Sequence, residues 1–318
     1  GAGMPSGKAV SSTALEPTTW RSTACEMRPT TSSSNCDETV DTALLLGGVL
    51  FAQSWFDQAH PEEQAIRELA EAIYQRVDWA FLQVRPPLLS MGWHPESGFI
   101  DHDWVGYNEG MLVYVLALGS PTHPIDEAAW AAWQGDYAKS WGRFHGQPHL
   151  GFGPLFGHQY SHVWIDFRGI QDEFMRGKGI DYFENSRRAT LAQRAYAIDN
   201  PQDFKGYDRY VWGLTASDGP GHFAQDYNGS TRIFRGYSAR GAGLKDAFDD
   251  GTIAPTAMLG SLPFAPAEVK RSVRVLHQRH GRHIFGDYGF IDAFNLTFDY
   301  DVPLTVGRRV PGWGWVAD

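Results

Sequence analysis

From Thr39 onward, segments with the apolar spacing of helices alternate with long segments that are rich in glycine, proline and aromatic residues. The alternation of apolar and polar side chains that marks a half-buried strand is weak throughout. Helices are predicted at residues 39–56, 61–82, 107–120, 125–141, 181–199 and 266–281. Two of them begin with a proline, which favours the first turn of a helix. We predict an all-α scaffold whose chemistry lies on one loop-rich face, since long loops in compact proteins are usually functional.

Residues 1–38 have a different composition. They are rich in serine and threonine and have no apolar period, so we predict a disordered or linker arm before a domain at residues 39–318. The arm lacks the continuous apolar core of a signal peptide, and we expect no export address in it. Cys25 and Cys36 both lie in the arm, where two cysteines predict neither a disulfide framework nor a metal site.

Charge and motif content exclude several functions. The 318 residues carry a net charge of −10 without a basic run containing aromatic residues, so we expect no nucleic-acid partner. The apolar runs at residues 43–56 and 111–119 are too short to span a bilayer. The glycine spacing does not fit a dinucleotide-binding G-x-G-x-x-G, and no G-x-S-x-G nucleophile elbow occurs. We predict that the protein uses no cofactor.

The aromatic content of 14% is the unusual part of the composition. One interpretation is a large core, because aromatic side chains bury much area per residue. The other is a cleft lined with rings that stack on the C–H faces of sugars. Composition alone favours the core.

The segment DYFENSRR, Asp181 to Arg188, has two interpretations. In the first, Asp181 caps a helix, Glu184 completes a capping box, and Glu184 pairs with Arg188 four residues later. In the second, Glu184 is the acid of an active site. The cap alone does not explain why two aromatic residues separate the carboxylates.

The segment WVGYNEG raises the same alternatives. Asp103 and Glu109 precede an apolar helix, and negative charge is favourable at a helix start. Alternatively, Glu109 is a functional carboxylate flanked by Trp104 and Tyr107, as in many sugar sites.

His158 and His162 are four residues apart and would share one face of a helix. No third ligand is evident nearby, so we predict no metal and favour histidines that bind a sugar hydroxyl or tie loops together. Asp166 and Arg168 are a candidate structural ion pair. Solvated turn positions are expected for Asp218, Asp249 and Asp250.

Several of these segments together resemble the glucoamylase-like domain family. That family includes the bacterial endo-β-1,2-glucanases of glycoside hydrolase family 144 and is related to a domain in cyclic β-1,2-glucan synthases. The resemblance covers about residues 39–318. Six segments occur in the family's order: PTHP, PLFGHQYSHVWIDFRG, DYFENSRRATLAQRAY, GYDRYVWGLTASDGPG, DDGTIAPTAMLGSLPFAP and YGFIDAFN.

The resemblance implies an (α/α)6 toroid of helical hairpins around a cleft, with long loops on one face. Even a generous count gives seven or eight helices, the six above among them, against the twelve of a complete toroid, so we expect the toroid to be incomplete at both ends. The resemblance also implies hydrolysis of a glycosidic bond by two carboxylates with inverting chemistry. One carboxyl protonates the leaving oxygen and the other activates water.

The resemblance implies roles for individual residues. Glu184 matches the family's glutamate and is the predicted general acid, with Tyr182 and Phe183 as part of an apolar wall that keeps it protonated. Candidates for the base, or for binding sugar hydroxyls, are Asp103, Glu109 and Asp166. Predicted substrate contacts are Trp93, Trp104, Tyr107, His158, Tyr160, His162, Arg187, Trp212 and Asp218.

The predicted function is hydrolysis of a β-glucan, above all as an endo-β-1,2-glucanase. The alternatives are a β-1,2-glucan transglycosylase and an inactive glucan-binding or scaffold domain. The expected partner is an oligo- or polysaccharide. We expect a periplasmic or secreted protein, because substrates of this type lie outside the cytoplasm in many bacteria. Oligomeric state, linkage specificity and the second carboxylate are left open.

Overall fold

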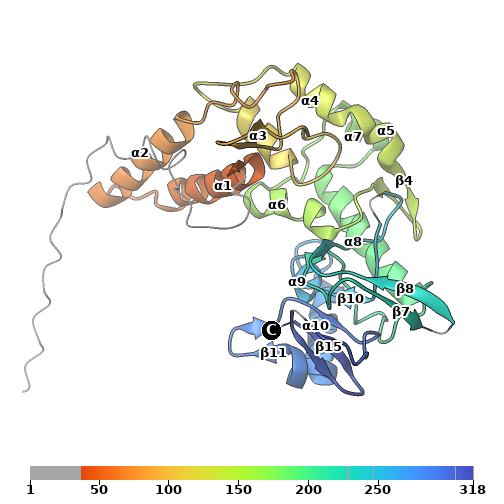
Figure 1. The fold of residues 1–318 in the computed structure, drawn as a ribbon. Coiled ribbons are helices and arrows are strands. Elements are labelled where there is room, and N and C mark those ends of the chain that lie inside the picture. The colour runs from red at the N-terminus through yellow and green to blue at the C-terminus, as the bar shows by residue number, and fades with distance from the viewer. Residues whose placement is uncertain (1–36, 228, 246, 305, 318) are drawn as a thin grey trace, which may run out of the picture. The chain divides into compact units, whose positions relative to one another are not determined.

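The computed structural model describes residues 37–317 apart from residues 228, 246 and 305, and these described residues belong to one compact unit (Figure 1). The predicted arm up to residue 36, with both cysteines, lies outside the described residues. The helices are α1 (Thr39–Trp55), α2 (Pro61–Gln75), α3 (Met111–Leu118), α4 (Ala128–Trp133), α5 (Tyr137–Ser140), α6 (Tyr160–Trp164), α7 (Glu173–Lys178), α8 (Tyr182–Asp199), α9 (Pro255–Leu259) and α10 (Pro266–Ile284), with 3₁₀ turns η2 (Gln134–Asp136) and η3 (Leu155–His158).

The described unit also contains short strands. They are β1 (Asp37–Glu38), β2 (Gly92–His94), β3 (Gly98–Phe99), β4 (Trp141–Phe144), β5 (Gln147–Leu150), β6 (Ala216–Ser217), β7 (Phe223–Tyr227), β8 (Ser230–Phe234), β9 (Ser238–Ala239), β10 (Thr252–Ile253), β11 (Phe285–Gly286), β12 (Gly289–Phe290), β13 (Phe294–Asn295), β14 (Arg308–Val310) and β15 (Gly314–Val316). Within the described residues they form six small sheets, the largest in the order β10–β13–β15–β14.

The strands correct the all-α prediction. Each is two to five residues long, which is too short for an alternation of apolar and polar side chains to be recognised. The structure combines helices with small antiparallel sheets. Five of the six predicted helices are found, at α1, α2, α3, α8 and α10, whereas the helix predicted at 125–141 is divided into α4, η2 and α5. The strand β1 begins inside the segment that was predicted as an arm.

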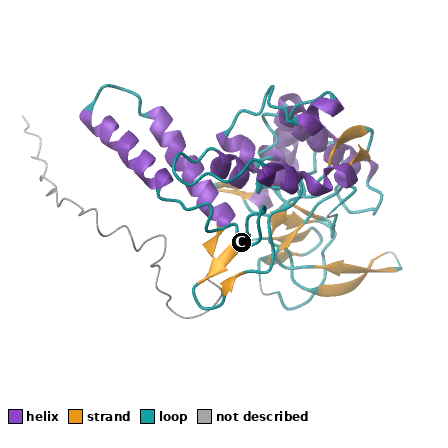
Figure 2. Cartoon of the chain, turned by 90° about the horizontal axis from the view of Figure 1, so that it is seen from above, coloured by secondary structure: helices purple, strands orange, loops and turns teal. Residues whose placement is uncertain are grey.

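The N-terminal part is built on an apolar core beneath α1, α2 and α3. Figure 2 shows α1 and α2 side by side. Trp164 of α6 packs so closely on α1 that a Cβ on Gly47 would lie 2.7 Å from its ring. The Tyr74 hydroxyl of α2 donates a 2.7 Å hydrogen bond to the Leu116 carbonyl of α3. The first contact uses the apolar surface of α1, and the second joins α2 to α3.

The long helix α8 connects this part to the C-terminal part (Figure 1). It begins where Asp181 Oδ1 accepts a 2.7 Å hydrogen bond from the Glu184 N–H, so the capping prediction is confirmed. It ends at Asn200, whose φ of 42° lies in the left-handed region, directly before Pro201. Asn185 and Gln193 are buried and bind the backbone of β5 and of the loops beside the helix.

In the C-terminal part, α9 and α10 lie beside the largest sheet (Figure 1). Met258 of α9 and Leu276 of α10 share a core with Phe294 of β13 and Val316 of β15. The register pairs Asn295 with both Thr252 and Trp315, so β13 is one of the two inner strands, with β15.

A fully buried ion pair fixes the loop before this sheet. Arg240 and Asp250 side chains are both 0% exposed, and two bonds join them, Nε to Oδ1 at 2.8 Å and Nη2 to Oδ2 at 2.9 Å. The remaining guanidinium donors bind the carbonyls of Ser217, Arg235 and Gly236. The expectation that Asp250 is a solvated turn residue is therefore wrong.

We predict that Arg240→Ala destabilises the protein by about 3–5 kcal/mol, because it leaves the Asp250 carboxylate buried without its partner. Chemical denaturation measures this loss. The exposed Arg274→Ala is the matched control and should change stability by less than about 0.5 kcal/mol. A double substitution, Arg240→Met with Asp250→Leu, should recover part of the loss. An Arg240→Ala variant as stable as the control would contradict this account.

The neighbouring Asp249 is not a solvated turn residue either. Its Oδ1 accepts a 2.7 Å hydrogen bond from Tyr207, and its Oδ2 accepts one of 2.9 Å from Tyr196. Burial raises the pKa of Asp249 to about 6, although the Gly251 N–H and the two phenols oppose this rise. The native state therefore binds the proton more tightly than the unfolded chain, whose carboxyl has an ordinary pKa of 3.8. The stability that this proton contributes is complete below that value and is lost as pH rises through about 6.

We predict that Asp249→Asn removes this part of the pH dependence. Thermal midpoints of the wild type and of Asp249→Asn, measured from about pH 4 to pH 7, should differ in slope, with the wild type losing more stability as pH rises. Asp57→Asn, at an exposed position, should follow the wild type. Parallel curves for wild type and Asp249→Asn would show that this carboxyl does not titrate in the window.

Candidate functional site

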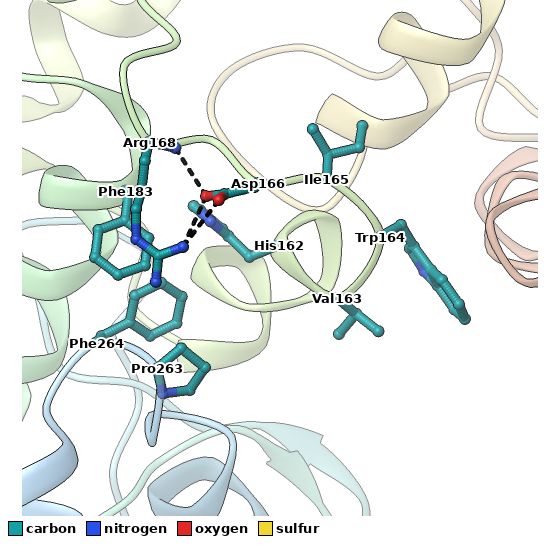
Figure 3. A pocket seen from close by; sticks show the side chains of 9 residues that line it. All are labelled: His162, Val163, Trp164, Ile165, Asp166, Arg168, Phe183, Pro263 and Phe264. Atoms are coloured by element: carbon teal, nitrogen blue, oxygen red, sulfur yellow. Dashed lines mark hydrogen bonds and ion pairs between the residues drawn. The ribbon is translucent and has the colours of Figure 1, made fainter. Parts of the chain in front are cut away.

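A pocket of about 230 Å³ lies where α6 and the loop after it meet the start of α8 (Figure 3). It contains two predicted site residues, His162 and Asp166. The full lining is His162, Val163, Trp164, Ile165, Asp166, Arg168, Phe183, Pro263 and Phe264. The volume is below the usual range for drug-sized ligands, so the pocket suits one ring-sized group.

Charged and aromatic side chains meet at the pocket wall. Arg168 Nη1 binds both Asp166 carboxylate oxygens, at 3.0 and 2.9 Å, so the predicted ion pair is confirmed. The guanidinium carbon lies 4.1 Å from the centroid of Phe183, whose ring lies 5.1 Å from that of Phe264 (Figure 3). The hydrogen bond from the Arg168 backbone N–H makes the largest contribution to lowering the pKa of Asp166, and the Arg168 guanidinium lowers it further. Asp166 therefore has the surroundings of an anion that binds hydroxyl groups, and not those of a proton donor.

His162 closes the inner side of the pocket. Its Nε2 lies 2.9 Å from Ser186 Oγ, which lies 3.3 Å from the Tyr107 hydroxyl. Burial lowers the pKa of His162 to about 4, so the imidazole is neutral near pH 7. Ser186 is fully buried and Asp166 is held by Arg168, so the three groups do not form a Ser–His–Asp nucleophile system.

The surroundings of Glu184 differ from the prediction. Its side chain is 32% exposed, and its carboxylate binds Arg188 Nε at 2.8 Å and Arg187 Nη1 at 3.3 Å. Tyr182 points away to the Asp172 carboxylate, and Phe183 belongs to the pocket. The predicted apolar wall around Glu184 is therefore wrong, because two guanidinium groups occupy that place.

Glu109 lies just before α3, near Tyr160 at the start of α6. Burial is the main cause that raises the pKa of Tyr160, and electrostatic interactions with Tyr237 and Glu109 raise it further. Tyr160 is 42% exposed and its ring lies 5.4 Å from that of Phe156. Tyr160 and Glu109, two predicted site residues, therefore interact electrostatically.

The segments of Glu109 and Glu184 are neighbours. Tyr107 stacks on Tyr182 with ring centroids 6.0 Å apart, and the Tyr107 hydroxyl lies beside Ser186. Each glutamate therefore lies within two residues of this contact. Both carboxylates stand at the N-terminal end of a helix, where the helix dipole favours negative charge.

Four of the predicted substrate contacts are core residues, which corrects the prediction. Trp104, Tyr107, His158 and Trp212 are buried, and a sugar could not reach them. The Trp104 and Trp212 indoles donate to Thr39 Oγ1 and Ser272 Oγ. Burial raises the pKa of Tyr107 to about 12 and lowers that of His158 to about 3.

The remaining predictions lie apart from the pocket. Asp103 uses both carboxylate oxygens to bind Arg85, at 2.9 and 2.7 Å. Its predicted role as a base or a hydroxyl contact stays a prediction. Trp93 is half-buried on β2 and meets Phe81 edge to face. Asp218 is half-buried, and its N–H donates to Asp292.

The sequence prediction missed Trp164 and Phe264, which line the pocket. Trp164 and Phe264 follow apolar residues in helical or turn segments, so nothing in their spacing distinguishes them from core residues. Among residues 37–317 as described, no three His, Cys, Asp or Glu side chains lie together in a way that could hold a metal ion. None of the described helices has the length and apolar character to cross a membrane.

Comparison with known proteins identifies the family. Residues 101–317, more than half of the chain, match the Glycoamylase family model, described as "Putative glucoamylase", and the chain belongs to this family. The exo-β-1,2-glucooligosaccharide sophorohydrolase (non-reducing end) of Parabacteroides distasonis is 31% identical over 299 residues, or 86% of this chain and 39% of that protein.

Two solved structures show the same fold. A Bacteroides uniformis protein with the same description as the family model has a TM-score of 0.71 at 34% identity, over 84% of this chain and 61% of that chain. The endo-β-1,2-glucanase of Chitinophaga pinensis, solved with sophorotriose and glucose, has a TM-score of 0.70 at 29% identity, over 82% and 60%. The chain thus spans about two fifths of the sophorohydrolase and about three fifths of these structures.

Proposed function

We propose that the protein is a glycoside hydrolase that cleaves β-1,2-linked glucan. The observation that carries this proposal is the 31% identity, over 86% of the chain, to a hydrolase of β-1,2-glucooligosaccharides. The similarity to an endo-β-1,2-glucanase supports the same linkage. We further propose that the helices belong to an (α/α)6 toroid, as the resemblance implied.

Glu109 and Glu184 are the proposed catalytic pair. Two guanidinium partners suit a group that works as an anion, so we assign Glu184 to the carboxylate that activates water. Glu109, half-buried beside Tyr160, is then the proton donor to the leaving oxygen. This exchanges the roles that the sequence alone suggested, and the contacts of Glu184 are the reason.

The pocket beside α6 is the proposed site for one sugar unit near this pair. Ser186 links it to the carboxylates, because it contacts both His162 in the pocket and Tyr107 next to Glu109. Phe183 is half-buried in the pocket lining and offers part of a ring face to the C–H groups of a sugar. Asp166 and Arg168 offer an acceptor and a donor to its hydroxyl groups.

Incubation with linear β-1,2-glucan tests this function. We expect new reducing ends and short β-1,2-linked products, and much lower rates on β-1,3- and β-1,4-glucans. Calorimetric binding of β-1,2-glucan without any product would instead identify a non-catalytic glucan-binding domain.

We predict that Glu109→Gln and Glu184→Gln each lower turnover by about 100-fold or more, the usual contribution of a general acid or base. Both variants should fold, since the ion pairs of Glu184 are partly exposed and contribute about 1 kcal/mol or less. Glu68→Gln, on the exposed side of α2, is the control and should keep full turnover. A folded Glu109→Gln or Glu184→Gln enzyme with wild-type turnover would remove that residue from the pair.

A further inference from the structure

The histidine of the pocket belongs to a short chain of hydrogen bonds that leads into the core. His162 Nε2 lies 2.9 Å from Ser186 Oγ, and Ser186 Oγ lies 3.3 Å from the Tyr107 hydroxyl. Ser186 and Tyr107 are only 0% and 2% exposed, so bulk water does not reach either hydroxyl. Each hydroxyl therefore needs a protein acceptor for its single hydrogen.

The available acceptors fix the direction of this chain. Within the described part of the protein, Ser186 Oγ is the acceptor that the Tyr107 hydroxyl reaches. The Asn185 side chain also acts on Tyr107. Burial raises the pKa of Tyr107 to about 12, whereas the Asn185 amide lowers it, as a donor to the phenol oxygen does. Tyr107 therefore donates to Ser186, and the hydrogen of Ser186 is directed to the one acceptor that remains in the chain, His162 Nε2.

This direction decides which ring nitrogen of His162 carries a proton. A nitrogen that accepts a hydrogen bond is unprotonated, and the imidazole is neutral near pH 7 because burial lowers its pKa to about 4. Its single proton then lies on Nδ1. His162 lines the pocket, and no hydrogen bond among residues 37–317 as described uses Nδ1. The rings of Phe167 and Phe264, with centroids 4.9 and 5.0 Å from that of His162, pack against the imidazole.

We propose that Tyr107 and Ser186 are positioning residues that hold His162 in its Nδ1–H tautomer, so that Nδ1 donates a hydrogen bond to a sugar hydroxyl in the pocket. The inference rests on the proposed function and deepens it, since it assigns the contact that the pocket makes with one glucosyl unit. The donor complements Asp166, whose carboxylate accepts hydrogen bonds. Because the buried hydroxyls set the tautomer before substrate arrives, little ordering is required upon binding.

The tautomer is measured directly by ¹⁵N NMR of histidine-labelled protein, because protonated and unprotonated ring nitrogens differ in chemical shift. The signals of His162 are those that disappear in His162→Gln. We expect a protonated Nδ1 and an unprotonated Nε2 in the wild type near pH 7. Ser186→Ala removes the donor to Nε2 and should let the Nε2–H tautomer become populated.

Ser161→Ala is the matched control. Ser161 is a buried serine next to His162, and its Oγ has no hydrogen-bond partner among the residues that the structure describes. This variant should keep the His162 spectrum of the wild type.

Kinetics with β-1,2-glucan test the donor role. We expect Ser186→Ala to raise KM about threefold to tenfold with a smaller change in kcat, which is the effect of weakening one neutral hydrogen bond to bound substrate. Ser161→Ala should keep the wild-type KM. If Ser186→Ala does not fold, Tyr107→Phe takes its place in both measurements, because it leaves Ser186 free to accept a hydrogen bond from the imidazole.

The outcomes separate this inference from the proposed function. A wild-type His162 with its proton on Nε2, or with protons on both nitrogens near pH 7, overturns the inference whether or not glucan is cleaved. If the wild type cleaves glucan and folded Ser186→Ala has the tautomer or the KM of the wild type, the inference is overturned and the function stands.

If the wild type cleaves no glucan, the proposed function fails, and calorimetry with β-1,2-glucan decides the donor role. Weaker binding by Ser186→Ala than by Ser161→Ala then supports it. Equal binding by the two variants, or no binding by the wild type, overturns it.

Discussion

The buried ion pair of Arg240 with Asp250 is the interaction on which the functional surface depends. Its guanidinium satisfies the carbonyls of Ser217 on β6 and of the consecutive residues Arg235 and Gly236. Asp250 also accepts hydrogen bonds from the N–H groups of Arg235 and Thr252. Side-chain Cβ atoms are excluded from part of this space, since one on Gly219 would overlap the guanidinium. The Asp250 carbonyl in turn accepts a hydrogen bond from the Asn295 side chain on β13 of the largest sheet. The buried ion pair thus joins the loop between Arg240 and Asp250 to the C-terminal core.

The helix α8 fixes the loops beside the N-terminal part through buried side-chain amides. Asn185 binds the backbone N–H and carbonyl of Leu150, and Gln193 binds those of Leu214. At its start, Asp181 caps the helix and also accepts the Gly169 N–H, which fixes the loop that carries Arg168. The segment DYFENSRR therefore has a structural role at the start of α8 that is compatible with the proposed catalytic role of Glu184.

The sequence predicted the helices well and the site in part. Period and proline position were sufficient for α2 and α10, because their apolar stripes and first turns are local properties. His158 and His162 do not share a helix face, since His158 ends the 3₁₀ turn η3 and α6 begins only at Tyr160. Whether a ring is core or surface depends on partners distant in sequence, which is why Trp104 was wrongly predicted as a substrate contact. The sequence shows Arg187 and Arg188 close to Glu184. Only the tertiary structure shows that these two arginines, and not aromatic rings, surround the Glu184 carboxylate.

The central claim is that this chain adds water across a β-1,2-glucosidic bond. Its most direct test is mass spectrometry of the products formed from β-1,2-glucan in ¹⁸O-labelled water. The account predicts one heavy oxygen at each newly formed reducing end and no product longer than the substrate. Products without the label, or with lengthened chains, would show that glucan is transferred to another sugar and would contradict the claim.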